Sequence, residues 1–500
     1  MKLQKKISNE HFSKINRQNE AIDIWVKNKG IGTFNHCPRF GKLYESCEII
    51  KRYVNKNALG KVLIVVPSDI ILKQWTETLY KIVGNYDVYF ITLITNYKLA
   101  SNPNEYLEQL PDLMIIDESH KFFNSDTLYS LLPKLAKIKF RLSLLGVLPD
   151  EKLTSRIEEF APIIDVITEE EAIKNKWISD YTEFNVPLEL RDADKIKYSQ
   201  YTMHMKDLLT QFSGQHMNFK VGGESIFSSE LELIIACYSG KKMLGKYVSS
   251  AKIRTVLCEL NGWHPNLNIN DVNEEKIDLQ WNPMLLYDRC KTFKTIMDSR
   301  NEILNNNIVK LEAILKVIKK FKLTTIIFTE SIEFVDTIVE HLNSMNINSI
   351  GYHSKIKSQP LIDPLTNDYY KVKSTGEVKK FGKTSIKKYA IENLENGNLT
   401  CIVAVKALDE GFTSETIEMV ITAGGTTNPI QYSQRIARGN TKSIYKPNKI
   451  TKVVNLFFDN FVLPDGSTAY SRDKSKLKQR QKYSKDVINL KKLEDLFDYY

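Results

Sequence analysis

The chain has 500 residues, of which 42% are hydrophobic, and 70 Lys and Arg against 60 Asp and Glu give it a net charge of +10. Because this length exceeds what one hydrophobic core normally supports, we expect two or three domains. The amino terminus lacks the apolar segment of a signal peptide, and the longest apolar runs are too short to cross a bilayer. These features exclude a membrane protein and predict an intracellular one, cytoplasmic or within a host cell.

The composition narrows the class further. Six scattered cysteines with no C-x-x-C pair argue against a disulfide framework and against a zinc site. The moderate positive charge is compatible with a polyanionic partner without requiring one. The abundance of Lys, Asn and Ile suggests an AT-rich genome, such as that of a virus.

The first half of the chain alternates strand-like and helix-like segments. After about 30 residues with the pattern of polar-faced helices, four apolar segments have the length of strands, at residues 61–67, 87–94, 112–120 and 141–149. Helical spacing lies between them and is clearest at 68–83. Strands that are apolar on both faces are typical of a parallel sheet covered by helices on both sides.

A second series of the same kind follows, with strand-like segments at 322–331, 346–354, 399–405, 417–425 and 452–458. Residues 190–304 between the two series are mostly helix-like and too long for a simple linker. Residues 359–384 are rich in turn formers and predict an inserted β-hairpin. Residues 472–498 are basic and then mixed, and they predict a terminal helix or arm.

The stretch FNHCPRFGKLYES, residues 34–46, is close to the phosphate-loop pattern G-x-x-x-x-G-K-[ST]. Gly41 and Lys42 occupy the positions of the second glycine and the lysine, and Arg39 lies within the loop. A short strand precedes the stretch and a helix follows it, so backbone N–H groups would face an anion. We therefore expect Arg39, Gly41 and Lys42 to bind nucleotide.

About 75 residues later, MIIDESHKF places two carboxylates at the end of a predicted strand. Ligands bind at the carboxyl edge of such sheets. We expect Asp117 to hold Mg²⁺, directly or through water, and Glu118 to orient the attacking water.

With these residues in order, the chain resembles the superfamily 2 helicases over residues 15–460, and D-E-S-H resembles their D-E-x-H box. The resemblance implies two tandem RecA-like parallel-sheet domains, ATP and Mg²⁺ as cofactors, and a nucleic-acid partner. Upstream, Gln18 matches a glutamine that reads adenine in the family. Residues 67–75 resemble the family's P-x-x-x-L-x-x-Q-W motif, which implies that Gln74 and Trp75 approach a nucleic-acid strand. We assign Thr95 to the same set.

The second half resembles the later motifs of the family. TIIFTESIEFVDTIVEHL is similar to motif IV, and ALDEGFTSETIEMVI to motif V, in which Asp409 and Gly411 match the D-x-G core. NPIQYSQRIARGN resembles motif VI, Q-R-x-x-R, through Gln434, Arg435 and Arg438. The resemblance implies that an arginine from this motif reaches the γ-phosphoryl group from the second domain. Residues 168–181 are similar to a segment of phage recombination helicases and restriction-type translocases.

Four positions depart from the family pattern. Leu43 replaces the Ser or Thr whose hydroxyl ligates Mg²⁺, and His36 replaces the first glycine. Motif III reads LSLLGVLPD in place of T-A-T or S-A-T, and Thr441 stands where a further arginine is common. We expect the Leu43 change to weaken ATP hydrolysis without abolishing it, because Mg²⁺ keeps several waters.

The expected organisation is a first RecA-like domain at 1–187, a helical insertion at 188–304, a second RecA-like domain at 305–460 and a basic tail at 461–500. The expected function is an ATP-dependent DNA helicase or translocase, with forks or branched recombination intermediates as candidate substrates. RNA is not excluded as the substrate, and the helical insertion is a candidate surface for a protein partner. Two alternatives stay open: a weakened, helicase-derived nucleic-acid-binding scaffold, and the motor subunit of a restriction-like complex.

Overall fold

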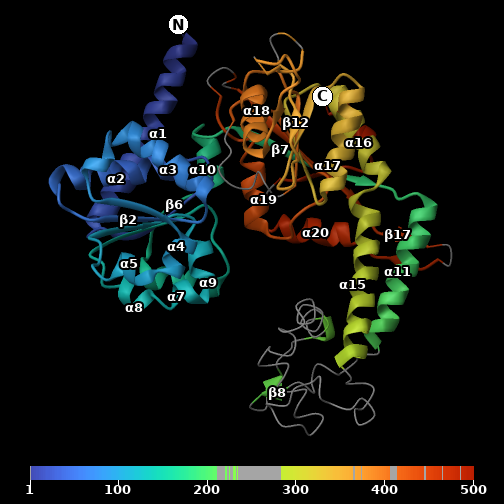
Figure 1. Cartoon of the computed structure of the whole chain (residues 1–500), viewed down its shortest axis with the longest axis horizontal. Helices are drawn as coiled ribbons and strands as arrows, with labels where there is room; N and C mark the ends of the chain where they lie inside the picture. Colours follow the sequence, from blue (N-terminus) through green and yellow to red (C-terminus); the bar gives the residue numbers. More distant parts are fainter. Residues whose placement is uncertain are drawn as a thin grey trace. The chain divides into compact units, whose positions relative to one another are not determined.

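A computed structural model describes the chain except residues 1, 211–219, 222–223, 226–228, 232–233, 235–282, 364–365, 367, 373, 406–413, 444–445, 447, 464–465, 485 and 500. It forms two compact units. The first comprises residues 1–187, 310–457 and 475–500, and the second comprises 188–309 and 458–474. The first unit contains two separate parallel sheets (Figure 1), which we call the first and second lobes.

The first lobe is a six-stranded sheet in the order β3-β2-β4-β5-β1-β6, and every neighbouring pair is parallel. Its strands are β1 (Ile31–His36), β2 (Val62–Val66), β3 (Ile91–Thr95), β4 (Leu113–Ile116), β5 (Phe140–Leu145) and β6 (Ile163–Ile167). Every residue of β2 and β4 is buried, as expected of central strands covered on both faces.

Helices cover both faces of this sheet (Figure 1). One face packs against α1 (Lys2–Lys27), α2 (Lys42–Lys56) and α3 (Asp69–Ile82), which contribute Ile22, Ile50 and Trp75 to one apolar core. The opposite face packs against shorter helices that contribute to a second core: α4 (Asn96–Ser101), α5 (Pro103–Leu107), α6 (Ser119–Phe123), α7 (Asp126–Tyr129), α8 (Leu132–Leu135) and α9 (Glu151–Phe160).

The second lobe is a seven-stranded sheet in the order β11-β14-β10-β15-β16-β7-β19. Its strands are β7 (Asp180–Leu188), β10 (Thr325–Thr329), β11 (Ser349–Tyr352), β14 (Cys401–Val405), β15 (Met419–Thr422), β16 (Ile450–Phe458) and β19 (Ile488–Asn489). The associated helices are α16 (Ile308–Phe321), α17 (Ile332–Ser344), α18 (Lys383–Glu395) and α19 (Pro429–Ile436). The predicted α/β class with two parallel-sheet domains is therefore confirmed.

Two details of the first lobe differ from the sequence expectation. The segment expected as a strand over 87–94 begins as a 3-10 turn (Tyr86–Val88), and only Ile91–Thr95 pairs with β2. Val88 and Phe90 are 68% and 55% exposed, so their apolar character does not reflect burial in the sheet. In addition, β6 was not predicted from the sequence.

The strand β7 crosses the expected domain limits. It belongs to the range 1–187 assigned to the first domain, but it hydrogen-bonds into the second sheet. On its other side, it pairs in parallel with β19, which lies within the expected tail. The second sheet therefore collects strands from both sides of the insertion.

The second unit contains the two described ends of the insertion, α11 (Asp192–Thr210) and α15 (Pro283–Asn305), which pack against each other. Most of the expected insertion between these helices lies outside the described residues. The same unit includes the short hairpin β17 (Phe461–Val462) and β18 (Thr468–Ala469), where the Tyr470 carbonyl accepts a hydrogen bond from the Tyr198 hydroxyl at 3.3 Å.

Residues 472–498 form α20 (Arg472–Arg480), β19 and α21 (Leu493–Asp498). Part of the basic segment is engaged within the second lobe: Lys476 pairs with Glu330 at 2.5 Å, and Arg480 is buried. Among the residues described, none of the helices is both long and apolar enough to cross a membrane.

Candidate nucleotide site between the first and second lobes

The loop between β1 and α2 carries the phosphate-loop residues. Gly41 has φ +121°, and a Cβ there would lie 2.3 Å from Nε2 of Gln18. Gln18 itself is buried on α1 and donates from Nε2 to the Phe40 carbonyl at 2.9 Å. The backbone conformation therefore favours glycine at position 41, and a Cβ there would also displace the Gln18 amide. Gln18, expected to read adenine, holds the loop backbone in this structure.

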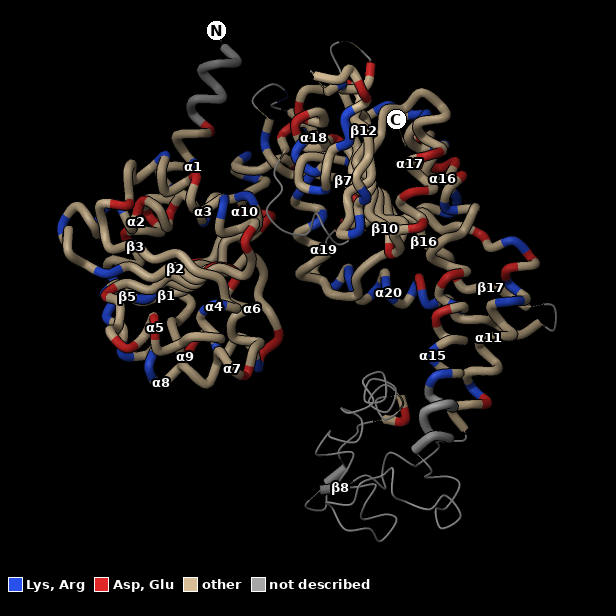
Figure 2. Tube along the Cα trace, in the orientation of Figure 1, with Lys and Arg blue, Asp and Glu red and all other residues tan. Residues whose placement is uncertain are grey.

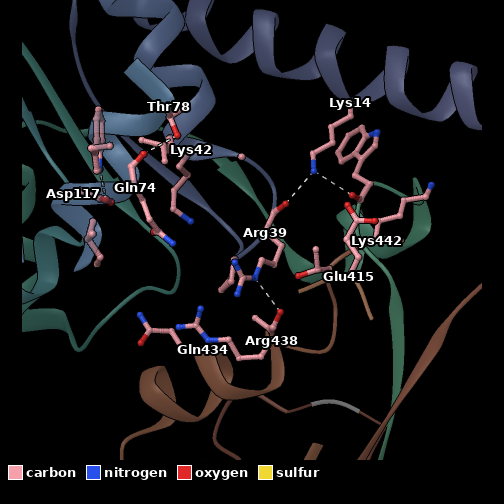
Figure 3. Close-up of a pocket in the computed structure, with 18 of the residues that line it drawn as sticks. Lys14, Arg39, Lys42, Gln74, Thr78, Asp117, Glu415, Gln434, Arg438 and Lys442 are labelled. Atoms are coloured by element: carbon pink, nitrogen blue, oxygen red, sulfur yellow. Dashed lines mark hydrogen bonds between the residues drawn. The ribbon is translucent and has the colours of Figure 1, made fainter. Parts of the chain in front are cut away.

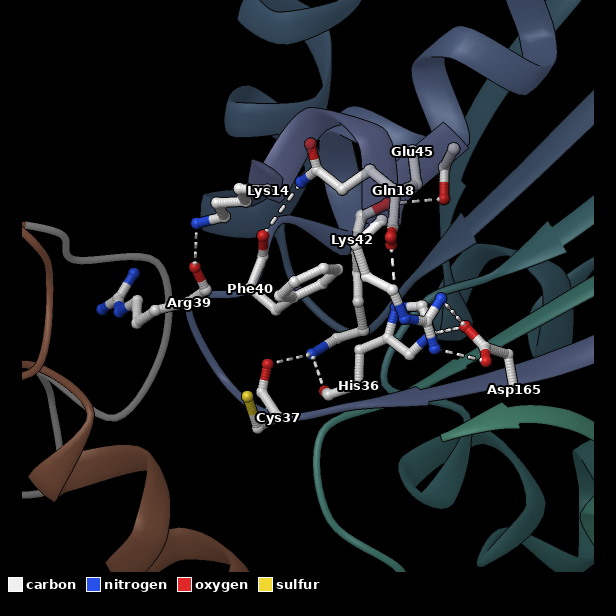
Figure 4. Close-up of polar contacts among 11 residues, drawn as sticks. Lys14, Gln18, His36, Cys37, Arg39, Phe40, Lys42, Glu45 and Asp165 are labelled. Carbon is white, nitrogen blue, oxygen red and sulfur yellow. Dashed lines mark hydrogen bonds and ion pairs between the residues drawn. The ribbon is translucent and has the colours of Figure 1, made fainter. Parts of the chain in front are cut away.

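A buried polar cluster lies beneath this loop (Figure 4). Nδ1 of His36 is 3.0 Å from a Glu45 carboxylate oxygen, and Nε2 is 2.9 Å from an Asp165 oxygen. Arg17 donates to both oxygens of Asp165, at 2.9 and 2.6 Å. His36, which replaces the first glycine of the pattern, thus connects β1 to α2 and β6 through polar side-chain contacts.

The charges of this cluster support one another. Burial alone would lower the pKa of His36, but the carboxylates of Glu45 and Asp165 outweigh it and raise that pKa. Burial likewise opposes ionisation of Asp165, yet the hydrogen bonds from His36 and Arg17 hold its pKa below the ordinary value. These contacts favour the protonated form of His36 between the two acidic side chains, one of which is also held by the Arg17 guanidinium.

Lys42 lies at the start of α2, and its Nζ donates to the His36 carbonyl at 2.7 Å, within its own loop. Leu43 packs against the apolar core under α2 and offers no oxygen. The next hydroxyl, Ser46, is buried and donates to the Lys42 carbonyl at 2.9 Å. It is thus committed to the helix backbone and does not replace the missing hydroxyl.

The acid pair follows β4, as the sequence predicted. One oxygen of Asp117 accepts from Nε1 of Trp75 at 2.8 Å, and the other accepts from the backbone N–H of Glu118 at 2.9 Å. Burial and the neighbouring Glu118 charge raise the pKa of Asp117 to about 6. Glu118 has φ +48°, a left-handed conformation uncommon for non-glycine residues and frequent at functional turns.

The second lobe reaches this acid pair through α19 and the turn after it. Nε2 of Gln434 donates to Glu118 at 3.3 Å, and the Ala437 carbonyl accepts from Nε of Arg39 at 3.1 Å. Arg438 lines the same cavity with 6% exposure. Arg435 lies elsewhere: it is buried with its guanidinium 4.9 Å from the centre of the Phe328 ring, and it does not line the cavity.

These residues surround one cavity of about 1080 Å³ (Figure 3). Its walls carry more cations than acids, and the cations are Lys14, Arg39, Lys42, Lys81, Lys121, Lys176, Arg438 and Lys442. Burial lowers the pKa of Lys14 to about 8, and burial together with the nearby Arg438 charge lowers the pKa of Arg39. Cations that destabilise one another in this way are stabilised by a multiply charged anion such as a triphosphate.

Sequence reasoning missed several cavity residues. Lys14 donates from Nζ to the carbonyls of Arg39 and Trp177 at 3.0 and 3.3 Å, and Lys442 pairs with Glu10. Lys14 could have been noticed because it lies one helical turn before Gln18 on the same helix. Glu10 and Lys442 are 432 positions apart, and the sequence alone offers no signal that joins them.

The residues expected to bind nucleic acid are not gathered on one surface. Gln74 and Trp75 line the cavity, and the Trp75 side chain is fully buried. Thr95 ends β3 and caps α4, where its hydroxyl accepts from the Lys98 N–H at 3.4 Å. Asp409 and Gly411, which were expected to bind the nucleotide cofactor, lie outside the described residues.

The site suits a magnesium–nucleotide complex better than a bare metal ion. Among the described residues, no group of three or more His, Cys, Asp or Glu side chains could hold a metal. Asp117 and Glu118 both line the cavity with Lys42, and a magnesium ion held by Asp117 would need phosphate and water oxygens to complete its shell.

Two protein-family models match the chain. The family model of the type III restriction enzyme res subunit matches residues 4–145, and that of the helicase conserved C-terminal domain matches residues 309–440. No curated protein sequence matches the chain.

Solved structures that are similar to the chain have low sequence identity to it. S. cerevisiae Dbp5 bound to RNA and ADP BeF3 is 11% identical with a TM-score of 0.50, over 96% of this chain and 90% of that one. The Hef helicase domain of Pyrococcus furiosus is 14% identical with a TM-score of 0.48, over 92% and 96%.

Proposed function

Since this chain belongs to the superfamily 2 helicases, we propose that it is an ATP-driven motor that moves along or remodels DNA, acting on forks or branched recombination intermediates. Its family makes it a nucleic-acid helicase or translocase that uses ATP. The choice of DNA, the type of substrate and the roles of individual residues are part of the proposal. RNA remains the competing substrate.

The observation that carries the proposal is the single cavity shared by Lys42, Asp117, Glu118 and Arg438. These side chains come from two sheets, and the second lobe touches the acid pair through Gln434. A nucleotide held there contacts both lobes, so its binding and release would change how firmly the lobes are joined. This coupling is the physical requirement for a motor.

In the proposed mechanism, Lys42 exchanges its contact with the His36 carbonyl for the β- and γ-phosphates, and the loop N–H groups bind the same anion. Asp117 would hold magnesium, which neutralises charge on the phosphates when it is bound. Glu118 orients the attacking water, and Arg438 stabilises the charge that develops on the γ-phosphoryl group. Gln434 keeps Glu118 in place from the opposite lobe.

We expect slow turnover. Neither Leu43 nor Ser46 offers a free hydroxyl next to Lys42, so one magnesium ligand of the usual loop is missing. The same observation favours the second candidate, a helicase-derived scaffold that binds nucleotide and nucleic acid without hydrolysis.

The test is ATP hydrolysis with and without single-stranded, forked and RNA oligonucleotides. We expect oligonucleotide-stimulated turnover in the wild type, its loss by a factor of about 10² or more in Glu118→Gln, and a rise in Leu43→Thr. Glu158→Gln removes the same charge at an exposed position of α9 and should leave turnover unchanged. If the wild type shows only background turnover and Leu43→Thr restores stimulated turnover, the result would instead support the scaffold. Stimulation that survives Glu118→Gln would contradict the assigned chemistry.

A further inference from the structure

Residues 355–388 of the second lobe hold an unusual share of the positive charge. They contain nine lysines and three acidic residues, a net charge of +6 where the whole chain carries +10. Figure 2 shows blue positions along this region, beside β12 and on α18. None of the helicase-like motifs described above includes this segment, so its positive charge needs a separate explanation.

The segment is a folded platform and not a solvated run of charge. Its strands β12 (Gln359–Pro360) and β13 (Lys380–Phe381) pair antiparallel, and bridges join Ile362 to Tyr369 and Lys371 to Val378. Its inner side chains Leu361, Tyr370 and Phe381 pack against the core of the second lobe, with the two rings 5.4 Å apart. The predicted inserted hairpin is thus present, and two isolated antiparallel bridges extend the pairing between its strands.

The outer face of the platform carries one exposed tyrosine and two lysines, together with Ile362 and Val378, which are 44% and 47% exposed. The bridge between Lys371 and Val378 sets an antiparallel register that places Tyr369 opposite Lys380. Tyr369 is 50% exposed, and Lys371 and Lys380 are both exposed. Among the residues that the structure describes, neither of these lysines forms an ion pair, so their charges are not neutralised within the platform.

The platform starts at the functional edge of the sheet. It follows the carboxyl end of β11 and leads into α18, whose first residues include Lys383 and Lys387. Ligands of parallel α/β sheets bind at this edge. Burial and the charge of Lys383 lower the pKa of Lys387, which shows how closely the cations are gathered there.

We propose that this platform is a nucleic-acid-binding surface on which Lys371, Lys380 and Lys383 contact backbone phosphates and Tyr369 stacks on a base. The inference rests on the proposed function, because it assigns a surface to the same nucleic-acid partner. Basic grooves that carry exposed aromatic rings suit single strands, because phosphates follow the cations and every base offers a face for stacking. An acidic protein would satisfy the lysines but would leave Tyr369 without a specific role.

The test uses the full chain, with Lys371→Gln/Lys380→Gln compared against Lys319→Gln/Lys320→Gln. The control pair is also exposed, but it lies in the last turn of α16, before the amino end of β10 and so at the opposite edge of the same sheet. Binding of a single-stranded DNA and of an RNA oligonucleotide is measured by fluorescence anisotropy over a range of salt concentrations. For two lost phosphate contacts, we expect the slope of log affinity against log salt to fall by about 1.4 in the platform variant only.

Tyr369→Ala provides a second readout that does not depend on charge. We expect it to weaken binding about fivefold or more, with the salt slope unchanged. Both platform variants should keep the melting temperature and the basal ATP turnover of the wild type.

The two levels of the inference fail differently. A wild type that binds the oligonucleotide, with the same slope in platform and control variants and full affinity in Tyr369→Ala, overturns the platform alone. A wild type with no oligonucleotide binding overturns the platform together with the nucleic-acid function. If the wild type shows no ATP turnover that depends on Glu118, while the platform variants behave as expected, only the motor function is contradicted.

Discussion

At the scale of single residues, His36 shows how a changed motif can still build its loop. A glycine at this position would leave space beneath the loop, whereas the imidazole fills it and bonds to Glu45 and Asp165. The sequence predicted Lys42, Asp117, Glu118 and Arg438 as one site because each has a motif. It could not predict the partner of His36, since Asp165 is 129 residues away and has no motif of its own.

The His36 cluster predicts how stability depends on pH. Because the folded protein raises the pKa of His36 above 6.5, the stabilisation is complete below pH 6.5 and is lost as the pH rises through the higher folded value. The folded protein lowers the pKa of Asp165 below 3.8, so that contribution is present above pH 3.8 and is lost as the pH falls through the lower folded value. The cluster should therefore stabilise most between these limits.

Urea unfolding of the wild type and of His36→Gln checks this expectation. The measurements run from about pH 5 to about pH 9, an interval that brackets the pKa of an ordinary histidine. The gap in unfolding free energy between the two proteins should be largest at the acidic end and should shrink as the pH rises. His204→Gln, an exposed histidine, is the matched control and should show no such gap. A gap that stays constant with pH would mean that folding does not shift the pKa of His36.

At the scale of elements, β7 explains a failure of sequence reading. Its residues DYTEFNVPL lack a continuous apolar run and include Glu183 and Asn185 at positions that are buried. Neighbours satisfy one oxygen of Glu183: its Oε1 accepts from the Tyr432 hydroxyl at 2.5 Å and from Asn455 at 2.9 Å, whereas its buried Oε2 has no hydrogen-bond partner among the described residues. The strands with apolar runs were predictable, whereas a strand stabilised by distant polar partners was not.

Glu183 should accordingly join several elements. It accepts hydrogen bonds from β16, from α19 and from Gln481 just after α20. Glu183→Ala removes the acceptor that these donors share and leaves them only their bonds to Asn455 and Asn185. We therefore expect a loss of about 1–3 kcal/mol in the free energy of unfolding. Glu183→Gln keeps an acceptor oxygen and should lose less.

Chemical denaturation measures both losses, with Glu340→Ala on the exposed face of α17 as the control. Equal stability in Glu183→Ala and Glu340→Ala would show that the polar cluster does not hold these elements together.

At the scale of the whole molecule, the nucleotide cavity predicts a link between ligand and stability. The first unit contains two lobes with separate cores, and the cavity is lined by both. A nucleotide that binds only the folded chain stabilises it by about 2.7 kcal/mol at 100 times its dissociation constant. We expect ATP with magnesium to raise the melting temperature of the wild type by a few degrees.

Thermal melts of Lys42→Ala and of Lys56→Ala separate this effect from general changes in α2. Lys56 is exposed at the far end of the same helix, so its variant should keep the full shift, whereas Lys42→Ala should lose most of it. An equal shift in both variants would place the nucleotide somewhere other than the β1–α2 loop.

The path of β7 has one more consequence, for a chain that has been cut. Because β7 precedes the insertion and its sheet partners follow it, a single engineered protease site within residues 211–282 would divide the chain inside one hydrogen-bonded sheet. The two fragments would share the β7–β16 and β7–β19 ladders and the Glu183 contacts, so we expect them to stay associated and to co-elute after cleavage. In this respect the protein is a natural candidate for reconstitution from two separately produced pieces.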